Sequence, residues 1–178
     1  GSTDVVVATM EDGMYEIKSV ASSDHLGGDE IVTRLFRHAA KNIKQKTGSD
    51  ITKDPRAVRR LRNECEKASQ ALSSQNGTHI EIDQLCDGHD FTWQITRKDL
   101  EDCCSGLFRH GLELIEDVLE VAKMNKSQVH SVALIGGSSR VPMLQTLVSE
   151  MFNFMTLSKS LNPYESVARG AAIEAAIL

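Results

Sequence analysis

The chain has 178 residues, 40% of them hydrophobic and 25% charged, a balance that is ordinary for a folded domain and excludes a disordered chain. Its 20 basic and 25 acidic side chains leave a formal net charge of -5, so no overall positive field attracts nucleic acid. No apolar run approaches the roughly 18 residues that a membrane span needs, so we expect neither nucleic acid nor membrane as a partner.

A β-hairpin is predicted near the N-terminus. Two apolar runs rich in β-branched side chains, residues 5–10 and 14–20, flank Asp12-Gly13. An Asp-Gly pair between such runs is a strong hairpin signal because both central turn residues need a positive φ. Leu26-Gly27-Gly28 then turns the chain into a helix that has Asp29 as its cap.

Two helices are predicted next. Apolar residues recur every four positions from 31 to 43, which gives the first helix one apolar face. Asp54-Pro55 opens the second helix, with a capping side chain before a proline at the first position, and its apolar face continues to Leu72. The arginines near its start form a solvated face or a partner contact rather than a nucleic-acid site; they are Arg56, Arg59, Arg60 and Arg62.

A second hairpin and a long helix occupy the middle of the chain. Residues 80–95 alternate apolar and polar side chains on both sides of Asp87-Gly88, which predicts the hairpin. Thr96 and Asp99 resemble a capping box at the start of a helix that reaches about residue 124. Gly111 inside this helix predicts a bend or a break.

In the last third of the chain, the sequence predicts one strand and two helices. Residues 131–135 form a short apolar strand, and Pro142 begins a helix to about residue 152. Asn162-Pro163 caps a final helix through residue 177. Two hairpins, several helices and one solitary buried strand together indicate an α/β fold.

The order of these elements predicts two subdomains. We expect the outer segments, residues 1–26 and 105–178, to come together around the 131–135 strand. Residues 27–104 have a hairpin and helices of their own, so we expect them to form an α+β subdomain inserted into the first. The chain begins abruptly with a strand and stops inside a helix, which indicates an excised fragment with Gly1-Ser2 left by tag removal.

The cysteines and histidines show no ligand spacing. None of the four cysteines is in a C-x-x-C arrangement, so we expect small buried hydrophobic side chains and a cytoplasmic location; they are Cys65, Cys86, Cys103 and Cys104. The six histidines lack metal-ligand spacing, and no serine, histidine and acid stand in a nucleophile motif. We therefore expect no metal site and no catalytic residue within the chain.

The candidate ligand-binding residues fall in two places. Gly136-Gly137-Ser138-Ser139-Arg140 follows the predicted apolar strand and precedes a helix. Glycines let a backbone approach phosphate, turn amides face an anion, and Arg140 adds a planar cation. A plain tight turn has the same pattern, so both interpretations stay open. Glu66 and Ser73 lie nearly on one helix face, where they either contact a ribose or face solvent.

Across nearly the whole chain, a series of short segments resembles the heat-shock seventy-kilodalton chaperones (the DnaK family), and the segments follow one another in the order found in that family. These segments are residues 5–20 with the Glu11-Asp12-Gly13 turn, His25-Leu26-Gly27-Gly28, Arg56-Ala57-Val58-Arg59-Arg60-Leu61-Arg62, Cys65-Glu66, Ile80-Glu81-Ile82-Asp83, Leu107-Phe108-Arg109, Gly136-Gly137-Ser138-Ser139-Arg140-Val141-Pro142, and Asn162-Pro163 with Gly170-Ala171-Ala172. The resemblance implies an actin-like (ribonuclease H-like) ATPase fold, with nucleotide held between two lobes and this chain as lobe II alone.

The resemblance also implies ligands, partners and site residues. ATP or ADP with Mg would bind the complete domain, nucleotide-exchange factors would grip the inserted subdomain, and J-domain co-chaperones and lobe I would be further partners. Glu66 and Ser73 would meet the sugar or base, and Asp4 would lie near the phosphates and cations. The full implied set is Asp4, Gly28, Glu66, Ser73, Gly136, Gly137, Ser138, Ser139 and Arg140.

At four positions the chain departs from the family's pattern. Ser69 stands where the family usually has lysine, Gln70 where it has arginine, Tyr164 where it has aspartate, and Asp29 where it has glutamate. Losing two cations removes charge-assisted hydrogen bonds of about 1.5–3 kcal/mol each, which weakens binding by roughly 10²- to 10⁴-fold. Tyr164 either fills part of the pocket or stacks against its contents. We expect a weakened affinity for nucleotide.

Three functions stay open at this point. The first is a lobe of an ATP-driven chaperone, with catalysis only in the complete domain and no useful hydrolysis by the fragment. The second is a divergent scaffold lobe with weak or no nucleotide binding. The third is another branch of the actin and sugar-kinase superfamily. The chaperone interpretation requires Glu66 and Ser138 to face one shared cleft.

Overall fold

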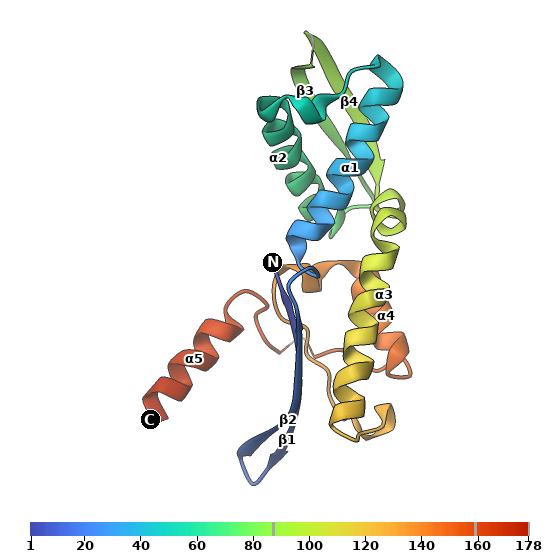
Figure 1. Ribbon diagram of the computed structural model, residues 1–178. Coiled ribbons are helices and arrows are strands. Elements are labelled where there is room, and N and C mark those ends of the chain that lie inside the picture. Colours follow the sequence, from blue (N-terminus) through green and yellow to red (C-terminus); the bar gives the residue numbers. More distant parts are fainter. Residues whose placement is uncertain (87, 159, 178) are drawn as a thin grey trace. The chain divides into compact units, whose positions relative to one another are not determined.

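The computed structural model describes residues 1–86, 88–158 and 160–177 of a mixed α/β chain (Figure 1). Within these residues it contains five α-helices, short 3₁₀ turns and two antiparallel hairpins. The chain divides into two compact units. Unit 1 consists of Gly1 and Gly27–Phe108, and unit 2 consists of Ser2–Leu26 and the chain from Arg109 onward. The mixed α/β class that the sequence predicts is confirmed.

Two helices of unit 1 pack against each other through the predicted apolar faces. They are α1 (Gly28–Thr47) and α2 (Pro55–Leu72), joined by the short 3₁₀ turn η1 (Ile51–Lys53). The predicted cap of α2 is confirmed, because the Asp54 carboxylate accepts hydrogen bonds from the backbone N–H groups of Arg56 and Ala57 at 2.8 and 3.3 Å. The buried side chains of the two helices are Ile31, Val32, Leu35, Ala39, Ile43, Ala57, Leu61, Cys65, Ala68 and Leu72.

A hairpin of β3 (Gly77–Cys86) and β4 (His89–Thr96) completes the core of unit 1, with β3 packed on α2. Its alternating apolar residues are buried, as the sequence predicts: Ile80, Ile82, Phe91, Trp93 and Ile95. Asp87 of the predicted turn lies outside the described residues, and Gly88 has a φ of 77°. The hairpin thus supplies the second layer against which the helices bury their apolar faces.

The arginine cluster at the start of α2 is solvated only in part. Arg56 and Arg59 are exposed. Arg60 donates to the carbonyl oxygens of Asp83 at 2.9 Å and Gln84 at 3.3 Å, at an irregularity in β3. Arg62 donates to the Thr33 hydroxyl at 3.3 Å, and its guanidinium lies 5.9 Å from the centre of the Phe36 ring. The last two arginines therefore hold elements of unit 1 together.

The long helix α3 (Arg97–Val121) begins at the predicted capping box. The Thr96 N–H donates to the Asp99 carboxylate at 2.8 Å, and the Asp99 N–H donates to the Thr96 hydroxyl at 3.2 Å. The helix continues through Gly111 as one element, so a break at this position, one of the two predicted alternatives, does not occur. Its hydrogen bonds on both sides of this glycine outweigh the roughly 1 kcal/mol that glycine costs in a helix interior.

Unit 2 opens with the hairpin of β1 (Thr3–Glu11) and β2 (Met14–Ser23). Asp12 and Gly13 have φ values of 50° and 79°, as the predicted turn requires. The buried Ser19 hydroxyl of β2 donates to the Val118 carbonyl oxygen of α3 at 2.7 Å. The core of unit 2 gathers around three buried residues, Leu119, Val148 and Phe152.

The strand predicted at residues 131–135 does not form. Only Ala133 makes an isolated parallel bridge, to Ser158, and the Ser158 N–H donates to the Val132 carbonyl oxygen at 2.8 Å. Val132 and Leu134 still pack against the unit 2 core, but they are only partly buried and Ile135 is 44% exposed, so the segment is not the buried strand that was predicted. The two predicted C-terminal helices are present as α4 (Pro142–Met151) and α5 (Ser166–Ile177).

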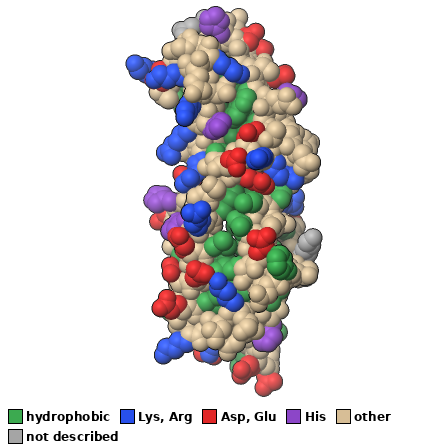
Figure 2. Space-filling view, turned by 90° about the vertical axis from the view of Figure 1, so that its right-hand side faces the viewer, with side chains coloured by type: hydrophobic (Ala, Val, Ile, Leu, Met, Phe, Trp, Pro, Cys, Tyr) green, Lys and Arg blue, Asp and Glu red, His purple; other side chains and the backbone are tan. Residues whose placement is uncertain are grey.

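The surface carries a mixture of charges. Figure 2 shows Lys and Arg side chains interspersed with Asp and Glu on the face in view, where hydrophobic side chains also reach the surface. Among the described helices, none is both long enough and apolar enough to cross a bilayer. In unit 2, the hairpin exposes several large apolar side chains, which are Val6, Met10, Met14, Tyr15, Ile17 and Val20.

Candidate functional site

The glycine-containing turn of unit 2 is held by segments from two parts of the chain. Gly136 adopts a φ of 92° and donates its N–H to the Pro163 carbonyl oxygen at 2.8 Å. The next residues form the 3₁₀ turn η3 (Gly137–Arg140), whose buried Ser139 offers its carbonyl oxygen to the Gln145 amide at 2.7 Å. A side chain at Gly136 would be strained by this backbone conformation. The turn therefore has a fixed shape that requires glycine.

Arg140 and Tyr164 form a cation–π pair beside this turn. The guanidinium carbon of Arg140 lies 4.8 Å from the centre of the Tyr164 ring, which is 64% exposed. A Cβ atom at Gly137 would lie 3.5 Å from Cε1 of the same ring. The Tyr164 N–H donates to the Asn162 side-chain oxygen at 3.0 Å, which fixes the loop that carries the ring. An exposed cation–π contact of this kind contributes about 0.5–1 kcal/mol.

The turn also offers hydrogen-bond donors. Within the described residues, neither the Gly137 N–H nor the Ser138 N–H has an acceptor. Gly137 is exposed and Ser138 is half-buried. Unpaired backbone N–H groups beside a guanidinium are the chemistry that phosphate oxygens require. The residues present at this turn therefore fit an anionic group.

Asp4 lies on β1 in unit 2, and its side chain is exposed. Its carboxylate accepts a hydrogen bond from the hydroxyl of Ser22, its register partner on β2, at 2.6 Å. One carboxylate oxygen is thereby ordered, and the exposed group keeps further lone pairs for a cation or a water molecule. The described residues contain no group of three or more His, Cys, Asp or Glu that could hold a metal ion.

In unit 1, Glu66 and Gln70 lie one turn apart on the exposed face of α2. Both line a hollow of about 420 Å³ between α2 and β3, together with Arg60, Asn63, Glu64, Lys67, Glu81, Ile82 and Asp83. Ser73 does not line this hollow. It is the C-cap residue of α2, and its hydroxyl donates to the Ser69 carbonyl oxygen at 3.3 Å. Of the two predicted ribose contacts, Glu66 thus lines this hollow and Ser73 does not.

The cations that line this hollow are already engaged, so they do not replace the ones expected at Ser69 and Gln70. The ammonium group of Lys67 pairs with the Glu64 carboxylate at 2.6 Å. Arg60 is held by the backbone of β3, as described above. At the two positions where the resemblance implies cations, the chain therefore has the Gln70 amide, which lines the hollow, and Ser69, which does not.

The predicted cap at Asp29 is wrong, because Gly27 is the N-cap of α1 and both Gly28 and Asp29 lie in its first turn. The Asp29 carboxylate is exposed and accepts a hydrogen bond from the Gly1 amino group at 3.0 Å. This hydrogen bond and the charge of the amino group hold the pKa of Asp29 below its ordinary value.

The predicted site residues fall into two groups. In unit 2 the structure brings Gly136–Arg140 together with Tyr164, and in unit 1 it places Glu66 beside Gln70. Because Glu66 and Ser138 belong to different units, their approach to one cleft stays a prediction. The sequence analysis did not identify Gln145, whose side-chain amide holds the turn through the Ser139 carbonyl oxygen. The signal that could have identified it is its position in the first turn of a helix that begins with Pro142, directly after the glycine turn.

Comparisons with known proteins agree over the whole length of the chain. The family model described as Hsp70 protein matches residues 1–178. A "Heat shock 70 kDa protein" of Penicillium citrinum is 48% identical over 178 residues, and one of Neurospora crassa is 47% identical. A ribosome-associated molecular chaperone of Saccharomyces cerevisiae is 46% identical. Each match covers 100% of this chain, but the chain spans only 35%, 28% and 29% of these relatives, respectively.

Proposed function

Because the chain belongs to the Hsp70 family, we propose that it is lobe II of the nucleotide-binding domain of a heat-shock chaperone. In this proposal unit 2 is the outer subdomain, and unit 1 is the subdomain inserted into it. The observation that carries the proposal is the turn Gly136–Arg140, which is held by Pro163 and flanked by the Tyr164 ring. Such a turn offers backbone donors, a cation and an aromatic face at one place.

Each side of the adenine nucleotide would meet different residues. The amides of Gly137 and Ser138 would hold phosphate oxygens, while Arg140 would meet the base or a phosphate. Glu66 would accept a hydrogen bond from the sugar. Hsp70 proteins bind ATP or ADP with Mg, and the ion would neutralise phosphate charge when bound, with Asp4 as the carboxylate that faces it.

The affinity of this site for nucleotide is expected to be low. Ser69 and Gln70 supply no cation, and Lys67 is paired with Glu64. Tyr164 places an uncharged ring against Arg140, at the position where the resemblance implies a carboxylate. Two missing charge-assisted hydrogen bonds of about 1.5–3 kcal/mol each correspond to a loss of roughly 10²- to 10⁴-fold in affinity.

Partners and turnover follow from the same proposal. Nucleotide-exchange factors would dock on unit 1, and J-domain co-chaperones would act on the complete domain in the cytoplasm. Phosphoryl transfer needs groups that converge on the nucleotide from both lobes, so this chain by itself would not hydrolyse ATP at a useful rate.

A second candidate function is a scaffold lobe that has lost nucleotide binding. The observations that favour it are Ser69, Gln70 and Tyr164, three changes within the residues assigned to nucleotide by resemblance. In this case the exchange-factor surface of unit 1 would be the retained function, and the glycine turn would serve only to shape unit 2. The two candidates differ in whether ADP binds and in whether restoring cations strengthens that binding.

Calorimetric titration of the chain with ADP separates the candidates. The test variant is Ser69→Lys with Gln70→Arg, and the charge-matched control is Ser74→Lys with Gln75→Arg at exposed positions. The lobe proposal expects the test variant, but not the control, to bind ADP roughly 10²- to 10⁴-fold more tightly than the unmodified chain. Binding that is equally tight in all three proteins would contradict both the weakened site and the scaffold.

Two further outcomes complete the design. If neither the unmodified chain nor the test variant binds ADP, the lobe proposal fails for this chain and the scaffold candidate remains. If the test variant gains affinity, Arg140→Ala in that variant should remove most of the gain, because the guanidinium lies at the glycine turn. Undiminished binding in the Arg140→Ala variant would show that the ADP binds elsewhere.

A further inference from the structure

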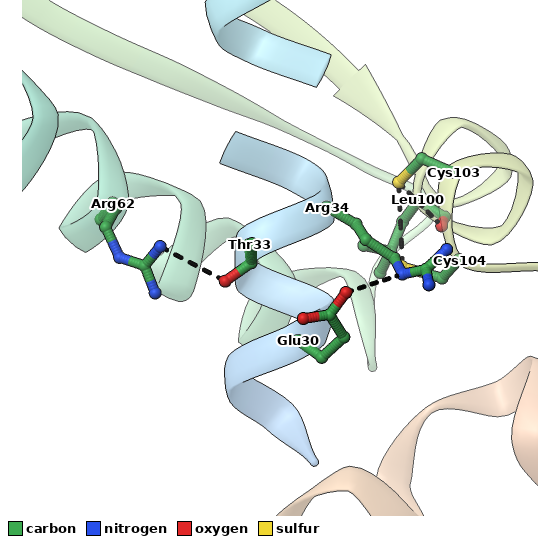
Figure 3. A network of polar contacts seen from close by, with 7 residues as sticks. All are labelled: Glu30, Thr33, Arg34, Arg62, Leu100, Cys103 and Cys104. Atoms are coloured by element: carbon green, nitrogen blue, oxygen red, sulfur yellow. Dashed lines mark hydrogen bonds and ion pairs between the residues drawn. The ribbon is translucent and has the colours of Figure 1, made fainter. Parts of the chain in front are cut away.

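Two adjacent cysteines of α3 lie in a polar network within unit 1 (Figure 3). Cys103 is partly exposed, whereas Cys104 is fully buried. Their sulfur atoms are 3.8 Å apart, and the Cys103 sulfur lies 3.2 Å from the Leu100 carbonyl oxygen, to which it donates as a thiol. Residue Cys103 therefore keeps some contact with solvent, whereas Cys104 lies wholly in the core.

A cation from another helix faces this pair. Arg34 of α1 pairs with the Glu30 carboxylate at 3.2 Å, and Figure 3 shows its guanidinium beside the two cysteines. A Cβ atom at Gly106, one turn beyond Cys103 on α3, would lie 3.9 Å from Nη1 of Arg34. Because Gly106 has no side chain, the guanidinium lies close along this face of α3.

The pKa values of the Cys103 and Cys104 thiols are shifted in opposite directions. The hydrogen bond with Cys104, together with the charge of Arg34, lowers the pKa of the Cys103 thiol, and the Asp99 carboxylate opposes this effect. The same hydrogen bond and burial raise the pKa of Cys104. Burial raises the pKa of Cys65, on the neighbouring helix α2, to about 12. Cys104 therefore remains the S–H donor, and Cys103 is the sulfur that ionises.

We propose that Cys103 is a modification site, where the sulfur of this partly exposed residue forms mixed disulfides with low-molecular-weight disulfides such as glutathione disulfide. The Cys103 thiol first loses its proton to solvent. The thiolate then attacks one sulfur of the reagent, the reagent's S–S bond breaks, and a new S–S bond forms to Cys103. The displaced thiolate leaves and takes a proton from solvent, so the Cys103 sulfur is oxidised and the leaving sulfur is reduced.

The reaction stops at the mixed disulfide because Cys104 cannot resolve it. Adjacent Cα atoms are about 3.8 Å apart across a trans peptide. A relaxed disulfide needs Cα atoms about 4.4–6.8 Å apart. A bond between Cys103 and Cys104 would also distort the α3 backbone, which both cysteines share. Cys104 is therefore not a resolving thiol for the adduct.

Mass spectrometry after incubation with glutathione disulfide locates the site. The 178-residue chain should gain one adduct first, on the peptide that contains Cys103. The Cys103→Ser variant should lose this adduct, and the Cys86→Ser variant should keep it. A first adduct on Cys86 or Cys104, or an internal Cys103–Cys104 disulfide in place of an adduct, would overturn the proposal.

Rate measurements test whether charge at Arg34 activates the thiol. The probe is a chromogenic aromatic disulfide at neutral pH, applied to chains that also carry Cys86→Ser. A lower thiol pKa speeds attack at neutral pH, because the gain in thiolate exceeds the loss of nucleophilicity. Arg34→Gln should thus slow the reaction, and Glu30→Gln, which frees the guanidinium, should speed it.

The paired variants distinguish charge from structural damage. Both substitutions break the same ion pair, so a purely structural effect would change the two rates in the same direction. Opposite changes support the proposal. Changes in one direction, or rates that equal that of the parent chain in both variants, would refute the activation of Cys103 by Arg34.

Discussion

The Ser19 hydroxyl offers a direct test of how unit 2 is held together. It is buried and donates to the Val118 carbonyl oxygen at 2.7 Å, so it joins the N-terminal hairpin to α3 across 99 positions of the chain. Ser19→Ala removes this hydrogen bond and adds no bulk. We expect the variant to lower the free energy of unfolding of unit 2.

The magnitude follows from the partners that remain. The Val118 carbonyl oxygen also accepts a hydrogen bond from the Ala122 N–H at 3.0 Å, so the substitution leaves no unsatisfied acceptor. The loss is then the net value of one hydrogen bond, about 1 kcal/mol, rather than the larger cost of an orphaned buried group. A change of this size corresponds to about a fivefold increase in the opening equilibrium of the region.

Hydrogen exchange followed by mass spectrometry is the assay, because it reports stability separately for peptides of each unit. Ser19→Ala should speed exchange about fivefold in slowly exchanging peptides of β2 and the C-terminal half of α3. Peptides of β3 and β4 serve as the internal reference. The control is Ser23→Ala, at a half-buried position of the same strand. Equal exchange in the two variants would refute the assignment of a stabilising role to the buried hydroxyl.

Three other changes have defined expectations. Leu61→Ala, at a position with 0% exposure, should cost about 2–5 kcal/mol in urea unfolding followed by tryptophan fluorescence, and a loss below about 1 kcal/mol would contradict its core role. The hydrogen bond from the Thr52 hydroxyl lowers the pKa of Asp50 from 3.8 to about 2, so its stabilising contribution is present above pH 3.8 and is lost as pH falls to about 2. Acid titration of Asp50→Asn should therefore differ from that of the parent chain above this window and converge with it below; a constant offset would oppose the assignment. Gly136→Ala should cost about 1–3 kcal/mol because its φ is 92°, whereas Gly170→Ala in α5 should stabilise by up to about 1 kcal/mol, and thermal unfolding with equal shifts in both would argue against backbone strain.

The elements whose signals are local could be predicted from the sequence. The Asp12-Gly13 turn, the Asp54 cap of α2 and the reciprocal Thr96–Asp99 hydrogen bonds all involve residues at most three positions apart. Their backbone conformations depend on side chains within the same turn, so the pattern is sufficient to predict them. The alternation of buried residues in β3 and β4 follows for the same reason, since its period is a property of the strand itself.

The elements that need a distant partner could not be predicted in this way. Residues 131–135 have the composition of a buried strand, but a strand exists only where a neighbour supplies a ladder, and here only Ala133 finds one among the described residues. Glycine is a residue type that often interrupts a helix, but α3 continues through Gly111 because the residues on both sides of this glycine are helical. Residue types alone thus predicted a strand at 131–135 that does not form and a possible break in α3 that does not occur.

The same distinction between local signals and contacts with distant segments applies to the candidate site. The glycine turn, Glu66 and the altered positions Ser69, Gln70 and Tyr164 were identified from residue type and order alone, because their chemistry is a property of each side chain. Only the tertiary structure decided that Tyr164 stacks on Arg140 and that Arg34 faces Cys103 from another helix. These pairs join segments far apart in the chain, and their distance and burial are set by packing, which residue order by itself does not contain.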